Sequence, residues 1–389
     1  MEHAEEVRII ETILAAIENN EIPMGEGEFR RPISNYISQD VLDQEMKLLF
    51  RGYPIIVGHS SQVQNPGDFI THDLSGVPIV VLRSKSGKLN AFLNVCRHRG
   101  ARLVPEACGH DKKAFVCPYH AWTYDADGRL IHVPIPEGFP SLDRDEFGLV
   151  PIPVESKHGF VWVKFTPHSD LAELDNHIGE MAPDLESFSA DTPFLYKSEV
   201  LIKSYNWKIG LEIFLELYHF KTLHRNSSFP IFYDTVGLYD RRYPHWRVIT
   251  PKKRITKLAD VDRGRWRLRP EVTMGYYIFP NTFMFVEQNV ISVMTVFPKG
   301  LGETTLSFMY LAAARAKDER VAKILDMNIE MMWAAAEEDF GIGESVQLGI
   351  NSGANEYMNF GRYEKGLDDF HSAIEDALHA SALPFSTRP

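Results

Sequence analysis

Apolar residues recur at two different spacings along the chain. At three- and four-residue intervals over residues 5–19 they predict an amphipathic helix. From about Tyr53 the pattern changes to short β-rich runs, and pairs of these runs flank turn sequences at 85–88 and 125–128, which predicts two hairpins. A further run at 159–165 predicts one more strand. Strands this close together indicate a small all-β domain inserted after an N-terminal arm.

The second half of the chain is patterned differently. Its apolar runs predict a strand at 198–204, a helix from Asn206 to about His224, four strands at 272–279, 282–287, 290–297 and 304–314, and two helices at 318–340 and 367–378. One antiparallel sheet with long helices packed on a face is an α+β arrangement. We therefore expect an N-terminal helical arm over 1–52, a β-domain over 53–165, and a larger α+β domain over 166–389 with which the arm packs.

Charge and composition narrow the class of protein. The 389 residues carry a formal net charge of −12, so nucleic acid and anionic membrane surfaces would repel the chain. No apolar run reaches the length of about 18 residues that a membrane-spanning helix needs, and the first residues are acidic rather than basic. We therefore expect a cytoplasmic protein with no nucleic-acid or membrane partner.

All three cysteines lie in one short stretch, which points to metal chemistry rather than to a disulfide framework. Two of them belong to the motifs Cys96-x-His98 and Cys117-x-x-His120, so each of two loops supplies one thiolate and one imidazole. Thiolates on one iron and imidazoles on the other, in a cluster of two irons and two sulfides, make a Rieske centre. A structural zinc site is the alternative, although zinc motifs usually pair like residues. Cys108 fits neither ligand slot and is expected to be a packing residue.

A second group of metal-ligating residues follows. His219 and His224 would stand about 140° apart on a regular helix, so a shared metal requires the predicted helix to bulge or end between them. Two imidazoles and one carboxylate form the facial triad of non-haem Fe(II) oxygenases. Histidines on an aromatic-rich helix are nevertheless more often ordinary core or surface residues. The residues alone leave the carboxylate open among Glu212, Glu216, Glu338, Asp339 and Glu344.

Both groups carry a family resemblance. The first motif, followed by Trp122-Thr-Tyr-Asp125 and Gly128, resembles the Rieske domain of Rieske non-haem iron oxygenases, although that family most often has glycine in place of Ala121. The pattern Glu216-x2-His219-x4-His224 after Asn206-Trp-Lys resembles the catalytic half of the same family, the alpha subunit of ring-hydroxylating dioxygenases, whose catalytic domain is helix-grip, or START-like. The resemblance covers roughly residues 30–385.

The resemblance implies roles for these residues. A [2Fe-2S] Rieske cluster would be held by Cys96, His98, Cys117 and His120. A mononuclear Fe(II) would be bound by His219, His224 and, from the acidic segment 337–347, Asp339. Glu216 would bridge, across a subunit boundary, a Rieske histidine of one protomer to an iron histidine of the next, which implies a homotrimer. Most aromatic-ring dioxygenases have aspartate there, and glutamate resembles the branch that acts on quaternary ammonium compounds.

The implied function is that of a terminal oxygenase component. No Gly-x-Gly-x-x-Gly motif opens a βαβ unit, so nicotinamide and flavin belong to a separate NAD(P)H-dependent flavin and iron–sulfur reductase, with or without a ferredoxin. The enzyme would use O2 for mono- or dioxygenation of a small aromatic compound. The alternative is oxidative N-demethylation or hydroxylation of a quaternary ammonium or betaine-like compound. Two other classes of protein remain as alternatives to an oxygenase: a non-catalytic Rieske electron carrier and a zinc-stabilised binding module.

The substrate pocket is expected to draw on the aromatic-rich segment between His224 and Asp339. Aromatic walls suit planar rings and methylated ammonium cations alike. The candidates are Phe229, Phe232, Tyr233, Tyr239, Trp246, Tyr276, Tyr277, Phe283 and Phe285.

Overall fold

The computed structural model describes residues 1–22, 24–234, 236–313 and 319–379. It divides into two compact units, one of residues 50–179 and one that joins residues 1–49 to 180–389. None of the helices in the described ranges is long and apolar enough to cross a membrane.

The unit of residues 50–179 is built mainly of short antiparallel strands. They are β2 (Ile55–His59), β3 (Phe69–His72), β4 (Ile79–Arg83), β5 (Leu89–Leu93), β6 (Cys108–Gly109), β7 (Ala114–Val116), β8 (Thr123–Asp125), β9 (Leu130–His132), β10 (Val154–Lys157) and β11 (Phe160–Val163), with one short helix, α4 (Leu174–Ile178). The strands form three small sheets of order β10–β11–β2, β5–β4–β3–β6 and β7–β8–β9.

Both predicted hairpins of this unit are confirmed, because β4 pairs with β5 and β8 pairs with β9. The turns depend on glycine: Gly87 and Gly128 both have a φ of +83°, a conformation that residues with a Cβ avoid. The predicted strand at 159–165 is confirmed as β11. A hydrophobic core that includes Phe92, Trp122 and Tyr124 joins the β5–β4–β3–β6 and β7–β8–β9 sheets.

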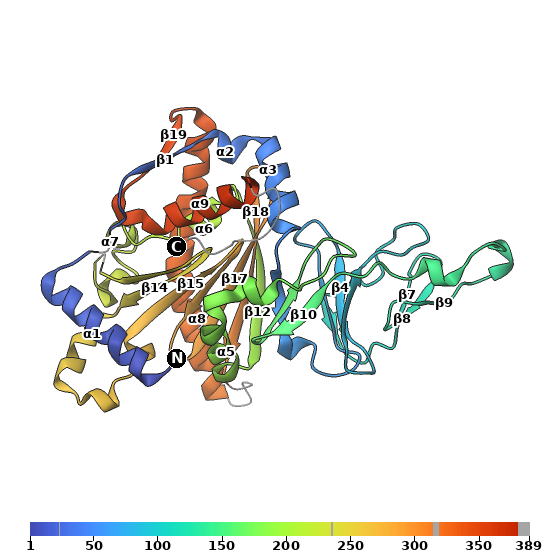
Figure 1. The fold of residues 1–389 in the computed structure, drawn as a ribbon, viewed down its shortest axis with the longest axis horizontal. Coiled ribbons are helices and arrows are strands. Elements are labelled where there is room, and N and C mark those ends of the chain that lie inside the picture. Colours follow the sequence, from blue (N-terminus) through green and yellow to red (C-terminus); the bar gives the residue numbers. More distant parts are fainter. Residues whose placement is uncertain (23, 235, 314–318, 380–389) are drawn as a thin grey trace. The chain divides into compact units, whose positions relative to one another are not determined.

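The larger unit is centred on a seven-stranded antiparallel sheet (Figure 1). Its strands are β12 (Phe194–Lys203), β13 (Leu238–Arg242), β14 (His245–Pro251), β15 (Val272–Ile278), β16 (Thr282–Val286), β17 (Val290–Gly300) and β18 (Glu303–Ala312). Their order is β12–β18–β17–β16–β15–β14–β13. The five strands predicted in this half of the chain are confirmed as β12 and β15 to β18, which gives the expected α+β class.

The apolar pattern does not predict β14 or β13, and β13 is the more polar of these two strands. It carries Asp240 and Arg242, which pair with partners on neighbouring elements instead of alternating with apolar residues. The buried guanidinium of Arg247 in β14 lies 2.8 Å from Asp240 and 3.1 Å from Asp184. Charged groups that neutralise one another therefore form part of this sheet, and such pairs leave no hydrophobic pattern.

Helices surround the sheet. They are α1 (His3–Asn19), α2 (Ser34–Ile37), α3 (Gln39–Glu45), α5 (Ala182–Asp191), α6 (Ile209–Glu212), α7 (Phe220–Leu223), α8 (Glu319–Ser352) and α9 (Lys365–His379), and a two-stranded pair joins β1 (Phe29–Pro32) to β19 (Tyr357–Phe360). The predicted helices at 5–19 and 367–378 are confirmed as α1 and α9, and the one expected to end near 340 continues to Ser352. Ala314 and Asp318, the predicted strand end and helix start, lie outside the described residues.

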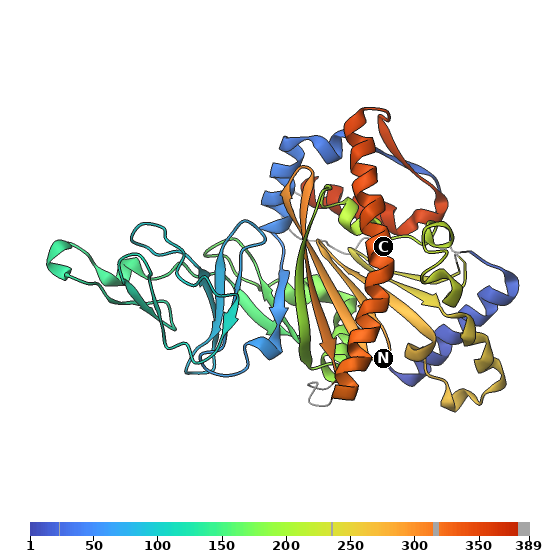
Figure 2. The same cartoon turned by 180° about the vertical axis from the view of Figure 1, so that it is seen from behind.

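Helices α5 and α8 cover opposite faces of the sheet. Phe188 of α5 packs on Tyr276 with ring centroids 5.1 Å apart, and Trp333 of α8 packs on Phe308 at 5.0 Å. The strand register places Tyr276 on the same face as Met309, the neighbour of Phe308 in β18, so the two aromatic contacts lie on opposite sides. Figure 2 shows α8 along its face of the sheet.

Two glycines allow α6 and α8 to approach each other closely. The ring of the buried Tyr205 lies between them: a Cβ at Gly210 of α6 would be 3.1 Å from this ring, and one at Gly343 of α8 would be 3.0 Å from it. Side chains at these positions would force the two helices apart. The packing therefore fixes α8 against the segment that follows α6.

The predicted continuous helix from Asn206 to His224 is wrong. Helix α6 ends at Glu212, and α7 does not begin until Phe220. The Glu216 carboxylate accepts hydrogen bonds from the backbone N–H groups of Tyr218 and His219, so it takes donors that a continuous helix would pair with main-chain carbonyls.

We expect Gly366→Ala to lower the stability of the larger unit. A Cβ at Gly366 of α9 would lie 2.1 Å from the carbonyl oxygen of Leu215, so the backbone must move, at a cost of about 2 kcal/mol or more. Thermal unfolding measures the effect. Gly349→Ala in α8 is the control, since its Cβ would meet nothing within 4 Å and the melting temperature should stay the same or rise. Equal melting temperatures for the two variants would contradict the close approach of α9 to Leu215.

Candidate metal centres

Two loops of the smaller unit have the same backbone hydrogen bonds. The N–H groups of Cys96 and Cys117 each donate to the carbonyl five residues later, at 2.8 Å. The N–H groups of Gly100 and Ala121, four residues after the cysteines, return to the cysteine carbonyls. These two residues have φ values of +77° and +53°, a conformation that costs a residue with a Cβ about 1 kcal/mol. Ala121 is thus the strained counterpart of Gly100, which accounts for a preference for glycine at this position.

The loops bring together the thiols and imidazoles of the two sequence motifs. Cys96 and Cys117 are buried free thiols. The ring centroids of His98 and His120 are 4.6 Å apart, and the Nδ1 atom of each ring is buried without a hydrogen-bond partner in the described part of the chain. Two buried thiols and two unpartnered imidazole nitrogens are the donor set that a Rieske cluster requires.

A single zinc ion needs compactly grouped ligands. Ligands about 2.0–2.3 Å from one tetrahedral zinc lie within about 4 Å of one another. Among the described residues, the group whose ligand atoms gather within 4.8 Å is His219, His224 and Asp339, and no three of the cysteine and histidine donors form such a group.

Cys108 is not part of this arrangement. It lies in β6, the edge strand of its sheet, where it pairs with Ile70. Its side chain is exposed, so the expectation that Cys108 is a packing residue is wrong. An edge strand of two residues leaves its side chains open to solvent.

Aromatic residues support the first centre. Trp122 stacks on His98 with centroids 4.8 Å apart and planes 8° from parallel. The Tyr124 hydroxyl accepts a hydrogen bond from the Arg97 N–H at 3.0 Å and lies 3.5 Å from Cys96 Sγ. Because its oxygen already accepts one bond, its proton is free to point at the sulfur. Tyr124 lies seven residues after Cys117, and the sequence pattern alone does not predict its contact with Cys96.

The second centre is assembled at the two ends of α7. His219 precedes this one-turn helix and His224 follows it, and their ring centroids are 5.2 Å apart. Asp339 of α8 is buried, and its Oδ1 lies 3.5 Å from His219 Nε2 and 3.1 Å from His224 Nε2. This oxygen nevertheless has no hydrogen-bond partner of acceptable geometry within the described residues. Three donor atoms that converge without hydrogen bonding fit a metal ion.

The other nitrogen of each imidazole faces a second carboxylate. Glu216 Oε1 contacts His219 Nδ1, and Glu338 Oε2 lies 2.7 Å from His224 Nδ1. A carboxylate at Nδ1 holds the ring proton there and leaves the Nε2 lone pair directed at Asp339. Glu216 and Glu338 therefore lie behind the imidazole rings and not among the converging atoms.

The remaining carboxylate candidates are engaged elsewhere. Glu344 accepts a hydrogen bond from the Ser204 N–H at 3.3 Å. Glu212 is buried, accepts from the Tyr36 hydroxyl at 2.7 Å and lies 3.1 Å from His371 Nε2. Neither reaches the group that gathers around Asp339.

Burial sets the electrostatics of the second centre. It raises the pKa of the Asp339 carboxyl, although the neighbouring imidazoles of His224 and His219 act in the opposite direction. Burial also lowers the pKa of His219, but Glu216 and then Asp339 outweigh it, so that the pKa is raised. The negative surroundings favour a cation at this point.

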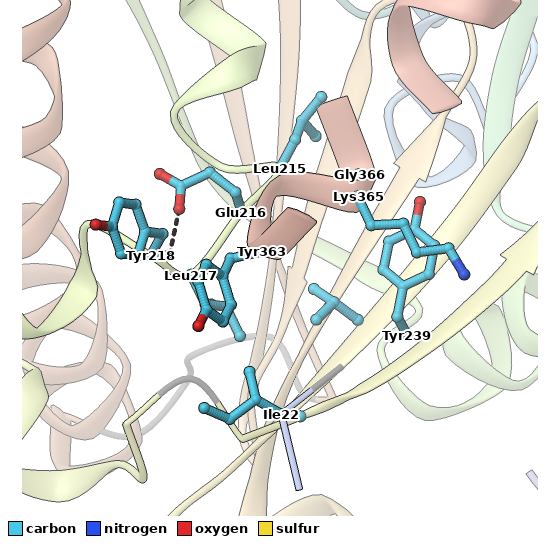
Figure 3. Close-up of a pocket in the computed structure, with 11 residues that line it drawn as sticks. Ile22, Leu215, Glu216, Leu217, Tyr218, Tyr239, Tyr363, Lys365 and Gly366 are labelled. Carbon is cyan, nitrogen blue, oxygen red and sulfur yellow. Dashed lines mark hydrogen bonds between the residues drawn. The ribbon is translucent and has the colours of Figure 1, made fainter. Parts of the chain in front are cut away.

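Glu216 also lines a small cavity of about 40 Å³ (Figure 3). The stacked rings of Tyr218 and Tyr363, whose centroids are 5.5 Å apart, stand beside it. A cavity of this size has room for a few water molecules and is far smaller than the roughly 300 Å³ or more of a typical ligand pocket. It is therefore not a substrate chamber.

The aromatic residues expected around a substrate divide between core and site. Tyr276 lies on the α5 face of the sheet, away from α8. Phe283 and Phe285 both contact Phe214, at 5.9 and 5.3 Å between centroids, and Phe214 also contacts Phe340, the residue after Asp339, at 6.2 Å. Aromatic side chains thus gather next to the second centre on the α8 face.

Comparison with known protein families identifies the class of protein. Residues 185–380 match the ring hydroxylating alpha subunit (catalytic domain), and residues 53–143 match the Rieske [2Fe-2S] domain. The chain belongs to the ring-hydroxylating alpha-subunit family and is a Rieske-type non-haem iron oxygenase.

Individual relatives differ in how much of their length is matched. The biphenyl 2,3-dioxygenase alpha subunit of Rhodococcus jostii (strain RHA1) is 33% identical over 199 residues, which are 50% of this chain and 43% of that subunit. The carnitine monooxygenase oxygenase subunit of Escherichia coli (strain K12) is 27% identical over 369 residues, 88% of this chain and 92% of that subunit. The chloroplastic choline monooxygenase of Beta vulgaris is 29% identical over 342 residues, 85% of this chain and 73% of that protein.

Among solved structures, the fold is similar to that of a quaternary ammonium Rieske monooxygenase in complex with an inhibitor. The TM-score is 0.78 at 23% sequence identity, and the match covers 92% of this chain and 97% of that chain. At this identity the likeness establishes the fold alone.

We expect Tyr124→Phe to keep its Rieske cluster but to shift its reduction potential to a more negative value. A hydrogen bond to a ligating sulfur stabilises the reduced, more negative cluster, and losing one worth about 1 kcal/mol corresponds to a shift on the order of 50 mV for one electron. Redox titration of the visible spectrum measures it. Thr123→Val, beside Tyr124, is the control. An unchanged potential would show that the hydroxyl does not donate to Cys96.

Proposed function

We propose that the chain is the terminal oxygenase component of a system that hydroxylates or oxidatively N-demethylates a quaternary ammonium compound of the carnitine, choline or betaine kind. The observation that carries this proposal is the extent of the match: the carnitine enzyme aligns over 92% of its length, whereas the aromatic-ring enzyme aligns over 43%. The aromatic substrate that the sequence analysis placed first becomes the second candidate. It is favoured by the higher identity, 33%, of the biphenyl enzyme.

Two features of the chain support the proposed substrate class. Glutamate at position 216 resembles the branch of the family that acts on quaternary ammonium compounds. Aromatic rings near the second centre, including Phe220 at 5.1 Å from His224 between centroids, offer π faces to a methylated ammonium cation.

The proposed site residues divide into two sets. The Rieske cluster would be held by Cys96, His98, Cys117 and His120. The mononuclear Fe(II) would be held by His219, His224 and Asp339, with ligand positions left open on one side. When bound, the cluster supplies electrons one at a time and the mononuclear iron supplies O2 activation.

The overall reaction balances as a monooxygenation. One C–H bond of the substrate becomes C–OH, and the second oxygen atom leaves as water. NAD(P)H and one proton provide the two electrons and the two hydrogens of that water. Each imidazole keeps its proton on Nδ1 and donates it to a carboxylate, that of Glu216 or Glu338, so the imidazoles stay oriented through the cycle.

Electrons would come from outside the chain and cross between protomers. An oxygenase subunit works with a reductase, which we propose to be a flavin and iron–sulfur protein, with or without a ferredoxin. We further propose a homotrimer in which Glu216 bridges His219 to a Rieske histidine of a neighbouring copy. This is supported by the position of Glu216 at the wall of the small cavity and by the inter-subunit electron transfer named for a solved quaternary ammonium Rieske monooxygenase.

Removal of a proposed iron ligand should empty one centre and spare the other. Asp339→Ala or His224→Ala should reduce iron from about three to about two atoms per chain and abolish turnover, with the cluster spectrum unchanged, because each site has its own ligands. Iron analysis and visible absorption measure this, and Glu344→Ala is the matched control. Loss of iron from the control alone would assign the third ligand to Glu344.

Glu216→Gln should load both metals and still transfer electrons poorly. The amide keeps the shape of the side chain but loses the charge that holds two imidazole N–H groups. Such a loss typically lowers activity by about 10- to 100-fold. Single-turnover oxidation of the pre-reduced cluster with O2 and substrate measures the rate, and light scattering gives the oligomer. Loss of the mononuclear iron as complete as in Asp339→Ala would make Glu216 a ligand; native rates in a strict monomer would reject the bridge.

The substrate class is tested by turnover with a compatible reductase. We expect coupled O2 uptake with at least one of carnitine, choline and glycine betaine. For the compound that reacts, replacing the ammonium nitrogen by carbon, as in 3,3-dimethylbutan-1-ol for choline, should weaken binding about tenfold, because cation–π attraction is lost. Hydroxylated product from biphenyl, with none from the ammonium compounds, would favour the second candidate.

A further inference from the structure

The imidazole of His224 is held from both sides by consecutive residues of α8. Glu338 Oε2 lies 2.7 Å from its Nδ1, and Asp339 Oδ1 lies 3.1 Å from its Nε2. The ring itself is only 2% exposed. Neighbouring residues on a helix point about 100° apart. Glu338 can therefore reach Nδ1 on one edge of the His224 ring while Asp339 reaches Nε2 on the other.

The carboxylate behind His224 is itself fixed. Ser227 Oγ donates to the same Glu338 oxygen at 2.6 Å, and the Ser227 N–H donates to the His224 carbonyl at 3.1 Å. The turn that carries His224 is therefore tied to α8 through two donors on one oxygen. Glu338 Oε2 contacts both Ser227 Oγ and His224 Nδ1. It is therefore not available to a metal on the Nε2 side of the ring.

We propose that Glu338 is a positioning residue for the mononuclear iron: it fixes His224 with the proton on Nδ1 and the lone pair of Nε2 directed at the metal, and Ser227 holds Glu338 in place. This inference rests on the proposed function, in which His224 and Asp339 bind iron. Glu338 would then act on the metal through His224 without binding it. It would not bridge to a neighbouring protomer, as is proposed for Glu216.

The two outer carboxylates differ in how they are placed. Glu216 reaches His219 from three residues away on the same segment, whereas Glu338 reaches His224 across a separation of 114 residues. Glu216 lines the small cavity, whereas Glu338 accepts a second hydrogen bond, from the Ser227 hydroxyl. Orientation of His224 thus depends on α8, which also supplies Asp339, so a shift of this helix would disturb a ligand and its partner together.

The test is Fe(II) affinity of the full-length protein, measured by competition with a chelator, together with the visible spectrum of the Co(II)-substituted second centre. Glu338→Ala should weaken Fe(II) binding by about 10- to 100-fold and change the Co(II) bands, since a ligand imidazole loses its orienting partner. Glu338→Gln, whose amide oxygen still accepts from Ser227 and Nδ1–H, should recover part of the affinity. Ser227→Ala should weaken binding in the same direction by less.

Glu337→Gln is the matched control, because it removes the same charge from the preceding, exposed residue of α8 and should bind Fe(II) as the native protein does. Native affinity and Co(II) bands in both Glu338 variants would overturn the proposal. Complete loss of metal in Glu338→Gln, as severe as in Asp339→Ala, would overturn it by making Glu338 a ligand. Retention of metal by Asp339→Ala would instead refute the proposed iron site.

Discussion

The second centre depends on how closely α8 packs against the segment between α6 and α7. Asp339 reaches two histidines that lie more than a hundred residues earlier only because Gly210 and Gly343 admit the ring of Tyr205 between the helices. A Cβ at either glycine would press on this ring, and the ring or a helix would have to shift by a few tenths of an ångström. Tight packing of small residues around one tyrosine is therefore the constraint on which the proposed iron chemistry rests.

The first centre has a different origin. Its donors come from two loops whose backbones repeat one hydrogen-bonding pattern, so the geometry is set locally, within a few residues of each cysteine. This is why the motifs could be recognised in the sequence. The buried thiols and unpartnered imidazole nitrogens follow directly from that pattern, and so does the strain at Ala121, whose positive φ explains why glycine suits the position.

Long-range features were harder to predict. The period of apolar residues revealed five of the seven strands of the main sheet. It missed β14 and β13, and in β13 Asp240 and Arg242 are paired charges. The helix expected up to His224 is broken by one side chain, Glu216, which replaces main-chain acceptors. Which acidic residue near 339 joins the histidines depends on how α8 is rotated about its axis, and no local pattern encodes that rotation. The choice of Asp339 came from family resemblance, and the convergence of its Oδ1 on both imidazoles supports that choice.

The central claim is that one chain carries two different iron centres. Mössbauer spectroscopy of the purified protein loaded with iron-57, combined with an assay of acid-labile sulfide, tests it most directly. We expect about two cluster irons for each mononuclear Fe(II), and about two acid-labile sulfides per chain. Cluster iron without any mononuclear Fe(II) would indicate an electron carrier, and zinc without sulfide would indicate a binding module; either result would contradict the account.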